Sequence, residues 1–75
     1  MKVWVEVYTT NENFILREFY LKIDVPEHLE EDVRNCMKTK NYDSLPPEFV
    51  DMVHESVMNV GYDFIKIFSI HEIKL

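Results

Sequence analysis

The stretch VWVEVYTTNENFILREFYLKIDV, residues 3–25, decides the fold of this 75-residue chain. Two sets of side chains alternate along its first part: Val3, Val5 and Val7 on one side, and Trp4, Glu6 and Tyr8 on the other. A period of two with β-branched and aromatic residues is typical of a strand. The polar residues TTNEN, 9–13, then favour a turn. We therefore predict a β-hairpin whose second strand ends near residue 24.

The second strand of this hairpin alternates cleanly only in its later half. There the inner set is Phe19, Leu21 and Ile23, and the outer set is Tyr20, Lys22 and Asp24. Continued backward, the same phase puts Arg17 inside and leaves Phe14 and Leu16 outside. Either a bulge near Arg17–Glu18 returns Phe14 and Leu16 to the core, or both side chains join the aromatic residues of the second sheet face.

Two amphipathic helices are predicted after the hairpin. In residues 24–40, Asp24 is a candidate N-cap, Pro26 suits the first turn, and the apolar stripe is Val25, Leu29, Val33, Cys36 and Met37. In residues 47–60, the predicted buried side is Phe49, Val50, Val53, Val57 and Val60. Gly61, the only glycine in the chain, is expected to end this helix in the left-handed conformation.

Residues 62–75 are predicted to form a third strand with an irregular phase. Ile65 and Ile67 agree with Ile73 and Leu75, whereas Phe64, Phe68 and Ile70 form a second set. Either the strand has a bulge near Phe68–Ser69, or both faces of the sheet are covered.

The element order ββααβ indicates a single α+β domain over residues 1–75. We expect a two-layer sandwich in which a helical hairpin packs on one face of a three-stranded sheet. If the helices run up and then down, the third strand is antiparallel to the second and parallel to the first. The strand orders 1-2-3 and 2-1-3 both satisfy this arrangement.

The composition narrows the classes of partner. Fourteen acidic and eight basic side chains leave a net charge of −6, which disfavours direct contact with nucleic acid or an anionic membrane. No apolar run approaches the roughly 18 residues of a membrane span, and the N-terminus has no secretory pattern. The single cysteine, Cys36, excludes an internal disulfide and suits a reducing compartment, so we expect a cytoplasmic protein.

Patterns that carry catalysis are missing from the sequence. His28 with Glu31 or Asp32 has helical spacing suited to weak metal binding, but no further ligand group accompanies the pair. Cys36 lies on an apolar stripe, where a buried thiol is the common role. No phosphate-cradling glycine loop or nucleophile motif is present. We therefore expect no catalytic residue, metal or cofactor.

The second sheet face is the first candidate binding surface. Its aromatic residues are Trp4, Tyr8, Tyr20 and Phe68, with Phe64 as a possible addition. Exposed aromatic area on a small protein often marks an interface. The face is interpreted as a homodimer contact, a docking site for another protein, or a solvated sheet surface. An RNA platform is disfavoured because such platforms have basic surroundings.

The acidic helices are the second candidate surface, formed by Glu27, Glu30, Glu31, Asp32, Asp51 and Glu55. Acidic first turns also stabilise helices by themselves. In functional terms, spread carboxylates imitate the phosphates of a duplex and would occupy a basic nucleic-acid-binding protein. We therefore expect a protein-binding module, with an inhibitor or regulator of such a partner as the sharpest hypothesis. The alternative is a structural homo-oligomer that uses the aromatic sheet face or a strand edge.

Overall fold

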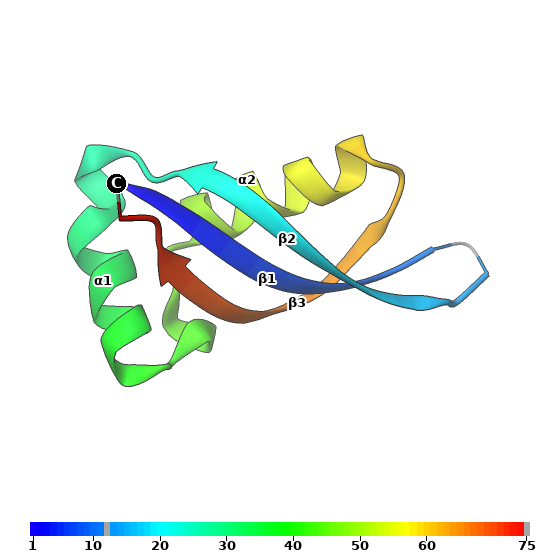
Figure 1. The fold of residues 1–75 in the computed structure, drawn as a ribbon, viewed down its shortest axis with the longest axis horizontal. Helices are drawn as coiled ribbons and strands as arrows, with labels where there is room; N and C mark the ends of the chain where they lie inside the picture. The colour runs from blue at the N-terminus through cyan, green and yellow to red at the C-terminus, as the bar shows by residue number, and fades with distance from the viewer. Residues whose placement is uncertain (12, 75) are drawn as a thin grey trace.

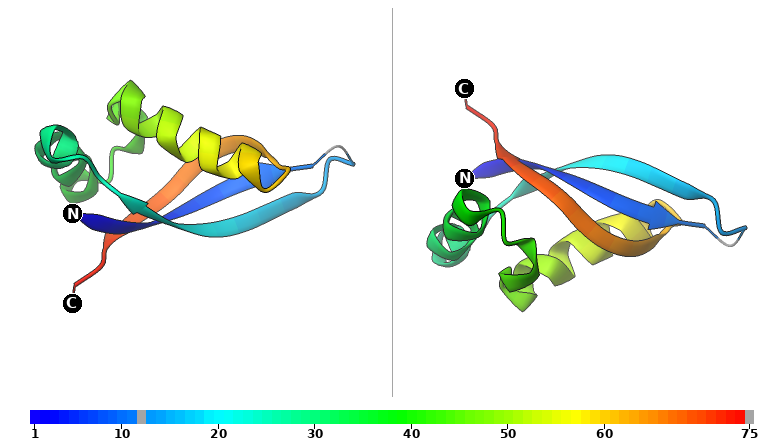
Figure 2. Two further views of the ribbon diagram at one scale, coloured as in Figure 1. Left: turned by 90° about the horizontal axis from the view of Figure 1, so that it is seen from above. Right: turned by 90° about the horizontal axis from the view of Figure 1, so that it is seen from below.

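The computed structural model describes residues 1–11 and 13–74, with every side chain in that range except that of Ile65. The strands are β1 (Lys2–Thr10), β2 (Leu16–Asp24) and β3 (Asp63–Glu72), and the helices are α1 (Glu30–Thr39) and α2 (Pro47–Asn59). Two short 3₁₀ turns, η1 (Glu27–Leu29) and η2 (Tyr42–Ser44), precede the helices. Both helices lie on the same side of the sheet (Figure 2), which confirms the predicted ββααβ two-layer fold.

The hairpin has the predicted inner face. β1 and β2 pair antiparallel without a register shift, from Lys2 opposite Asp24 to Thr10 opposite Leu16. No bulge interrupts β2, so the first of the two alternatives, the return of Phe14 and Leu16 to the core, does not occur. Leu16 keeps the phase of Glu18 and Tyr20 and lies on the side away from the helices, and 63% of Leu16 is exposed.

The direction predicted for the third strand is wrong. The sheet order is β2-β1-β3, and β3 is antiparallel to β1 and therefore parallel to β2. The reason is that α1 lies across one end of the sheet, and only α2 runs along its length (Figure 1). Between β2 and β3 the chain thus runs along the length of the sheet only once, in α2. As a result, β3 begins at the end of the sheet where the hairpin turns.

Two register shifts explain the irregular phase of β3. Ser69 lies opposite Glu6 and Ile67 opposite Val7, so Phe68 is an extra residue, and the first of the two sequence interpretations, a bulge near Phe68–Ser69, holds. A second shift skips Ile65, between Lys66 opposite Tyr8 and Phe64 opposite Thr9. The two bulges place Phe64, Ile67 and Ile70 on the helix side although their spacing is three. Leu75, which the sequence pattern groups with Ile65, Ile67 and Ile73, lies outside the described residues.

The core lies between β1 and the two helices. Val3, Val5, Val7, Phe49, Val53 and Val57 have no exposed surface. The predicted stripe of α1 is buried or, at Met37, partly buried. Val60 is the exception on α2, because this helix ends at Asn59 and the chain turns away, leaving 55% of Val60 exposed. Asp24 is not an N-cap either, since it is the last residue of β2.

Both helices end in a left-handed residue, and the two ends share one hydrogen-bond pattern. Gly61 has a φ of 83°, Gly61 N donates to Met58 O at 3.0 Å, and Tyr62 N donates to Val57 O at 3.3 Å. At the end of α1, Lys40 has a φ of 56°, and Asn41 N donates to Cys36 O at 3.0 Å. These are Schellman-type ends, for which glycine is the preferred residue.

The helices are short. α2, with 13 residues, is the longest helix described, whereas a bilayer span needs about 20 residues. Within the described residues, no helix has the length and apolar character to cross a membrane.

Replacing the two left-handed residues should change stability in opposite directions. Lys40→Gly removes the cost of a left-handed non-glycine residue and should raise the free energy of unfolding by about 1 kcal/mol. Gly61→Ala should lower it by about the same amount. No atom lies within 4 Å of a Cβ built at position 61, so this loss comes from the backbone alone.

Urea denaturation measures both changes. Lys38→Gly, inside α1, is the matched control and should destabilise the protein by about 1 kcal/mol. If Lys40→Gly destabilises the protein as Lys38→Gly does, the left-handed end of α1 is contradicted.

Candidate functional site

The sheet face away from the helices, called the open face here, is built from three rows of side chains. Along β1 the rows are Lys22–Trp4–His71, Tyr20–Glu6–Ser69 and Glu18–Tyr8–Lys66. They lie on one face because residues two apart in a strand point the same way. The structure thus places Trp4, Tyr8 and Tyr20 on one face, as the sequence predicted.

Glu6 organises the middle of the open face. Its carboxylate accepts hydrogen bonds from the Tyr20 hydroxyl at 3.2 Å and from Ser69 Oγ at 2.9 Å. The hydrogen bond to Glu6, and the negative charge of that carboxylate, raise the pKa of Tyr20. The acidic side chain at the centre of an aromatic surface is therefore held by neighbours from both outer strands, and its charge is partly satisfied within the sheet.

Tyr8 is the centre of an aromatic group at the next row. Its ring meets Phe68 edge-on, with ring centroids 5.3 Å apart. Lys66 Nζ lies 5.6 Å from the centroid of the Tyr8 ring, within the range of a cation–π interaction. Partial burial, followed by the carboxylates of Glu18 and Glu6, raises the pKa of Tyr8. The bulge at Phe68 makes this group possible because it brings that ring to the open face.

A shallow apolar depression lies at one end of the open face. Trp4, Tyr20 and His71 line it, and its volume, which is largely open to solvent, is about 460 Å³. Trp4 is 43% exposed and Tyr20 is 62% exposed. Sequence reasoning missed His71, whose place opposite Trp4 depends on the bulges in β3.

Beyond the opposite end of the same face lies the apolar hairpin tip, formed by Phe14, Ile15 and Leu16, of which Leu16 lies on the open face. Phe14 is 89% exposed and Ile15 is 51% exposed. The side chain of Asn11 fixes the turn, because its Oδ1 accepts hydrogen bonds from Asn13 N at 2.9 Å and Ile15 N at 3.1 Å. Phe14 has a φ of 58°, a conformation that bulky residues rarely adopt. The tip extends beyond the end of α2 (Figure 1).

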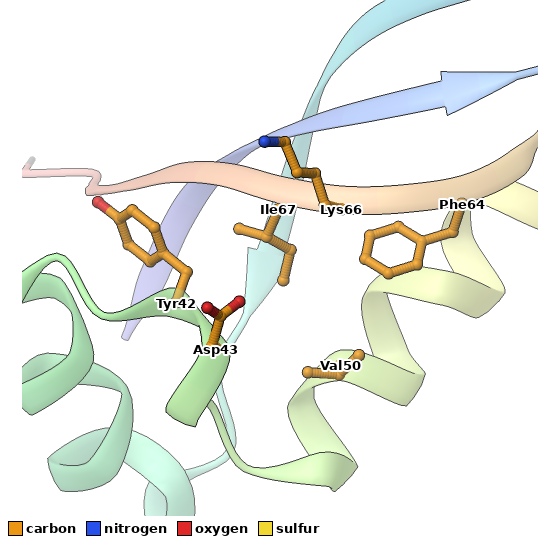
Figure 3. A pocket seen from close by; sticks show the side chains of 6 residues that line it. All are labelled: Tyr42, Asp43, Val50, Phe64, Lys66 and Ile67. Carbon is orange, nitrogen blue, oxygen red and sulfur yellow. The ribbon is translucent and has the colours of Figure 1, made fainter.

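Phe64, which the sequence offered for the open face, lies on the helix side instead. Figure 3 shows Phe64 and Ile67 pointing toward the helices, while Lys66 points away from them. Phe64 and Ile67 line a small hollow of about 230 Å³. Its other lining residues are Tyr42, Asp43, Val50 and Lys66. The bulge at Ile65 is the reason, since it shifts Phe64 out of the phase of Lys66.

The net charge of the protein is concentrated in the helical layer, residues 25–60. This segment has eight acidic and three basic side chains, a net −5 of the total −6. Residues 1–24 have four acidic and three basic side chains, and residues 61–75 have two of each. The two candidate surfaces thus differ sharply: one is acidic and helical, and the other is nearly neutral and aromatic.

The predicted acidic residues do not all have the same role. Glu30 accepts a hydrogen bond from the Met1 α-ammonium at 2.6 Å. This hydrogen bond lowers the pKa of Glu30 and raises that of the Met1 α-amino group. Glu30 is therefore a structural residue that joins the start of β1 to α1. No local sequence pattern signals this role, because the fold brings the two groups together.

The remaining acidic residues are exposed. They are Glu27, Glu31, Asp32, Asp51 and Glu55, and none has an ion pair within 4.0 Å among the residues that the structure describes. His28 Nε2 lies 2.9 Å from Glu48 Oε2 and so links η1 to the start of α2.

The other reactive side chains have structural surroundings. Cys36 is 7% exposed, and its burial raises the pKa of the thiol, which keeps it protonated. His54 lies against Phe64, with ring centroids 5.7 Å apart. Within residues 1–11 and 13–74, no three His, Cys, Asp or Glu side chains gather in a way that would hold a metal ion.

The ion pair between Met1 and Glu30 should make stability depend on pH in a defined window. The lowered pKa of Glu30 adds stability above its ordinary value of 4.5, and this is lost as the pH falls through the folded-state pKa. The raised pKa of the Met1 amino group adds stability below 8.0, and this is lost as the pH rises through the folded-state pKa.

Thermal melts of the native chain and of Glu30→Gln across the pH range measure this effect. The difference in melting temperature should be largest between pH 4.5 and pH 8.0 and shrink on both sides. Glu31→Gln, one residue along, is the control and should give no such maximum. If the difference in melting temperature between the native chain and Glu30→Gln is the same at every pH, the ion pair does not form in solution.

Comparison with protein-family models, curated protein sequences and solved structures finds no match for this chain. The two surfaces must therefore be interpreted from their own chemistry: exposure, charge and shape.

Proposed function

We propose that this protein is a non-enzymatic protein-binding module whose acidic helical layer docks on a basic surface of another protein. The observation that supports this most is the separation of charge, with a net −5 in residues 25–60 and nearly balanced charge elsewhere. Charge that serves only solubility does not have to be concentrated in one layer of the protein. A one-sided field orients a partner of opposite charge before contact.

Asp51 and Glu55 are the strongest support within this layer. They are exposed and lie in the middle of α2, outside its first and last turns, where the helix dipole does not favour them. Spaced four residues apart, the two carboxylates repel each other by about 0.2–0.5 kcal/mol. The fold gains nothing from this pair, whereas a basic partner would. Glu31 and Asp32 are less informative, because they lie in the first turn of α1.

The partner class that fits this surface best is a nucleic-acid-binding protein. Such proteins hold arrays of Lys and Arg that neutralise phosphates. Exposed carboxylates on the start of α1 and on α2 offer a similar array of negative charge on a compact support. Bound there, the module would mask the basic surface and act as an inhibitor or regulator. Association by this means is fast and weakens steeply with salt.

Neutralising Asp51 and Glu55 should weaken binding without harming the fold. The double variant Asp51→Asn/Glu55→Gln should unfold at the same or slightly higher denaturant concentration, because a repulsion is removed. The matched control, Glu18→Gln/Asp63→Asn, changes the net charge equally but on the sheet. Proteins captured from a host lysate at low salt should be lost with the first variant and kept with the second.

Two competitions complete this experiment. Moderate salt and duplex DNA should each release the captured proteins, because both compete for the same basic surface. Binding that resists salt and DNA, or that the two double variants change equally, would contradict the proposal.

A further inference from the structure

We infer that the open face is covered by a second copy of the chain, in an antiparallel face-to-face dimer. In this dimer Leu16, at the base of the hairpin tip of each copy, lies over the depression of the other. The inference does not depend on the acidic layer or on its partner. It rests on three features: an exposed Leu16 and a depression at opposite ends of the open face, balanced charge between them, and a turn held by hydrogen bonds.

Leu16 and the depression are placed for reciprocal contact. Leu16 lies opposite Thr10 at one end of β1, and the depression surrounds Trp4 at the other end. Six residues of strand separate these positions, about 20 Å. A two-fold axis across the strands, between the Glu6 and Tyr8 rows, exchanges the two ends. Leu16 of one copy then lies over Trp4 and Lys22 of the second copy, and the same contact occurs twice, as a closed dimer requires.

The charges between the two ends are balanced. The rows contain two carboxylates and two ammonium groups, from Glu6, Glu18, Lys22 and Lys66. With the axis at this place, the Tyr8 row of one copy faces the Glu6 row of the other, so Lys66 approaches Glu6 of the second copy. The helical layers, each with a net −5, stay on the outside and far apart. A dimer through the helices would press these like charges together.

The described part of the hairpin tip is held by hydrogen bonds and is largely exposed. The hydrogen bonds to Asn11 Oδ1 fix the turn, and Phe14 is held in the left-handed conformation with most of its ring in solvent. Three consecutive large apolar residues thus bury little in one copy. A rigid tip loses little conformational entropy when it is buried, which favours association. Twisted sheets of this kind pack face to face with their strands nearly aligned.

A single charge at the tip should separate the dimer. In analytical ultracentrifugation at tens of micromolar, the native chain should sediment as a dimer, and Leu16→Glu should weaken self-association by roughly tenfold or more. Met58→Glu is the matched control: Met58 is 59% exposed on α2, close to the exposure of Leu16, but lies on the helical layer. It should leave the dimer intact. Because Leu16 has no part in the core, Leu16→Glu should melt like the native chain at dilutions where both are monomers, and only the native melt should rise with concentration.

Cysteine cross-linking tests the antiparallel arrangement itself. An equimolar mixture of Leu16→Cys and Lys22→Cys should form a disulfide-linked dimer under mild oxidation, and each variant alone should form much less. Glu55→Cys, on α2, should link to neither. Cys36 does not interfere because its thiol is buried. A native chain that sediments as a monomer overturns the inference. So does equal disruption by Met58→Glu, or linking that is as strong within each variant as in the mixture.

Discussion

The structure depends on the burial of one side of a single strand. β1 pairs with a strand on each edge, and Val3, Val5, Val7 and Thr9 have no exposed surface. Because side chains alternate along a strand, burying this set forces Trp4, Glu6 and Tyr8 onto the other face. The helical chain after the hairpin covers only one side (Figure 2). The aromatic open face is therefore a direct consequence of how the core is built.

The distribution of charge follows the same two layers. The sheet contributes a nearly neutral surface with aromatic and apolar groups, and the helices contribute almost all of the net charge. These properties suit different partners. The nearly neutral sheet face suits another surface without net charge, and the acidic helical layer suits a basic protein. The two proposals are compatible because a face-to-face dimer leaves both helical layers outside. Such a dimer would present the acidic surface twice.

Features set by local periodicity could be predicted from the sequence. The inner face of the hairpin, the stripes of both helices and the left-handed Gly61 all follow from spacing within a few residues. The direction of β3 could not, because it depends on α1 lying across the sheet end, which no local pattern records. The sides taken by Phe64 and His71 depend on two bulges, of which the sequence indicated only the one near Phe68. The contact of Glu30 with Met1 joins residues far apart in the chain, so periodicity says nothing of it.

The central claim is that the open face is the surface on which this chain associates with itself. The most direct measurement is a dilution series followed by amide and indole NMR spectra, because it shows which residues change as copies separate. Dilution should shift the signals of Trp4, Tyr8, Leu16 and Tyr20, while those of Asp51, Glu55 and Met58 on α2 stay in place. Spectra that do not change with concentration, or shifts confined to the helices, would contradict the account.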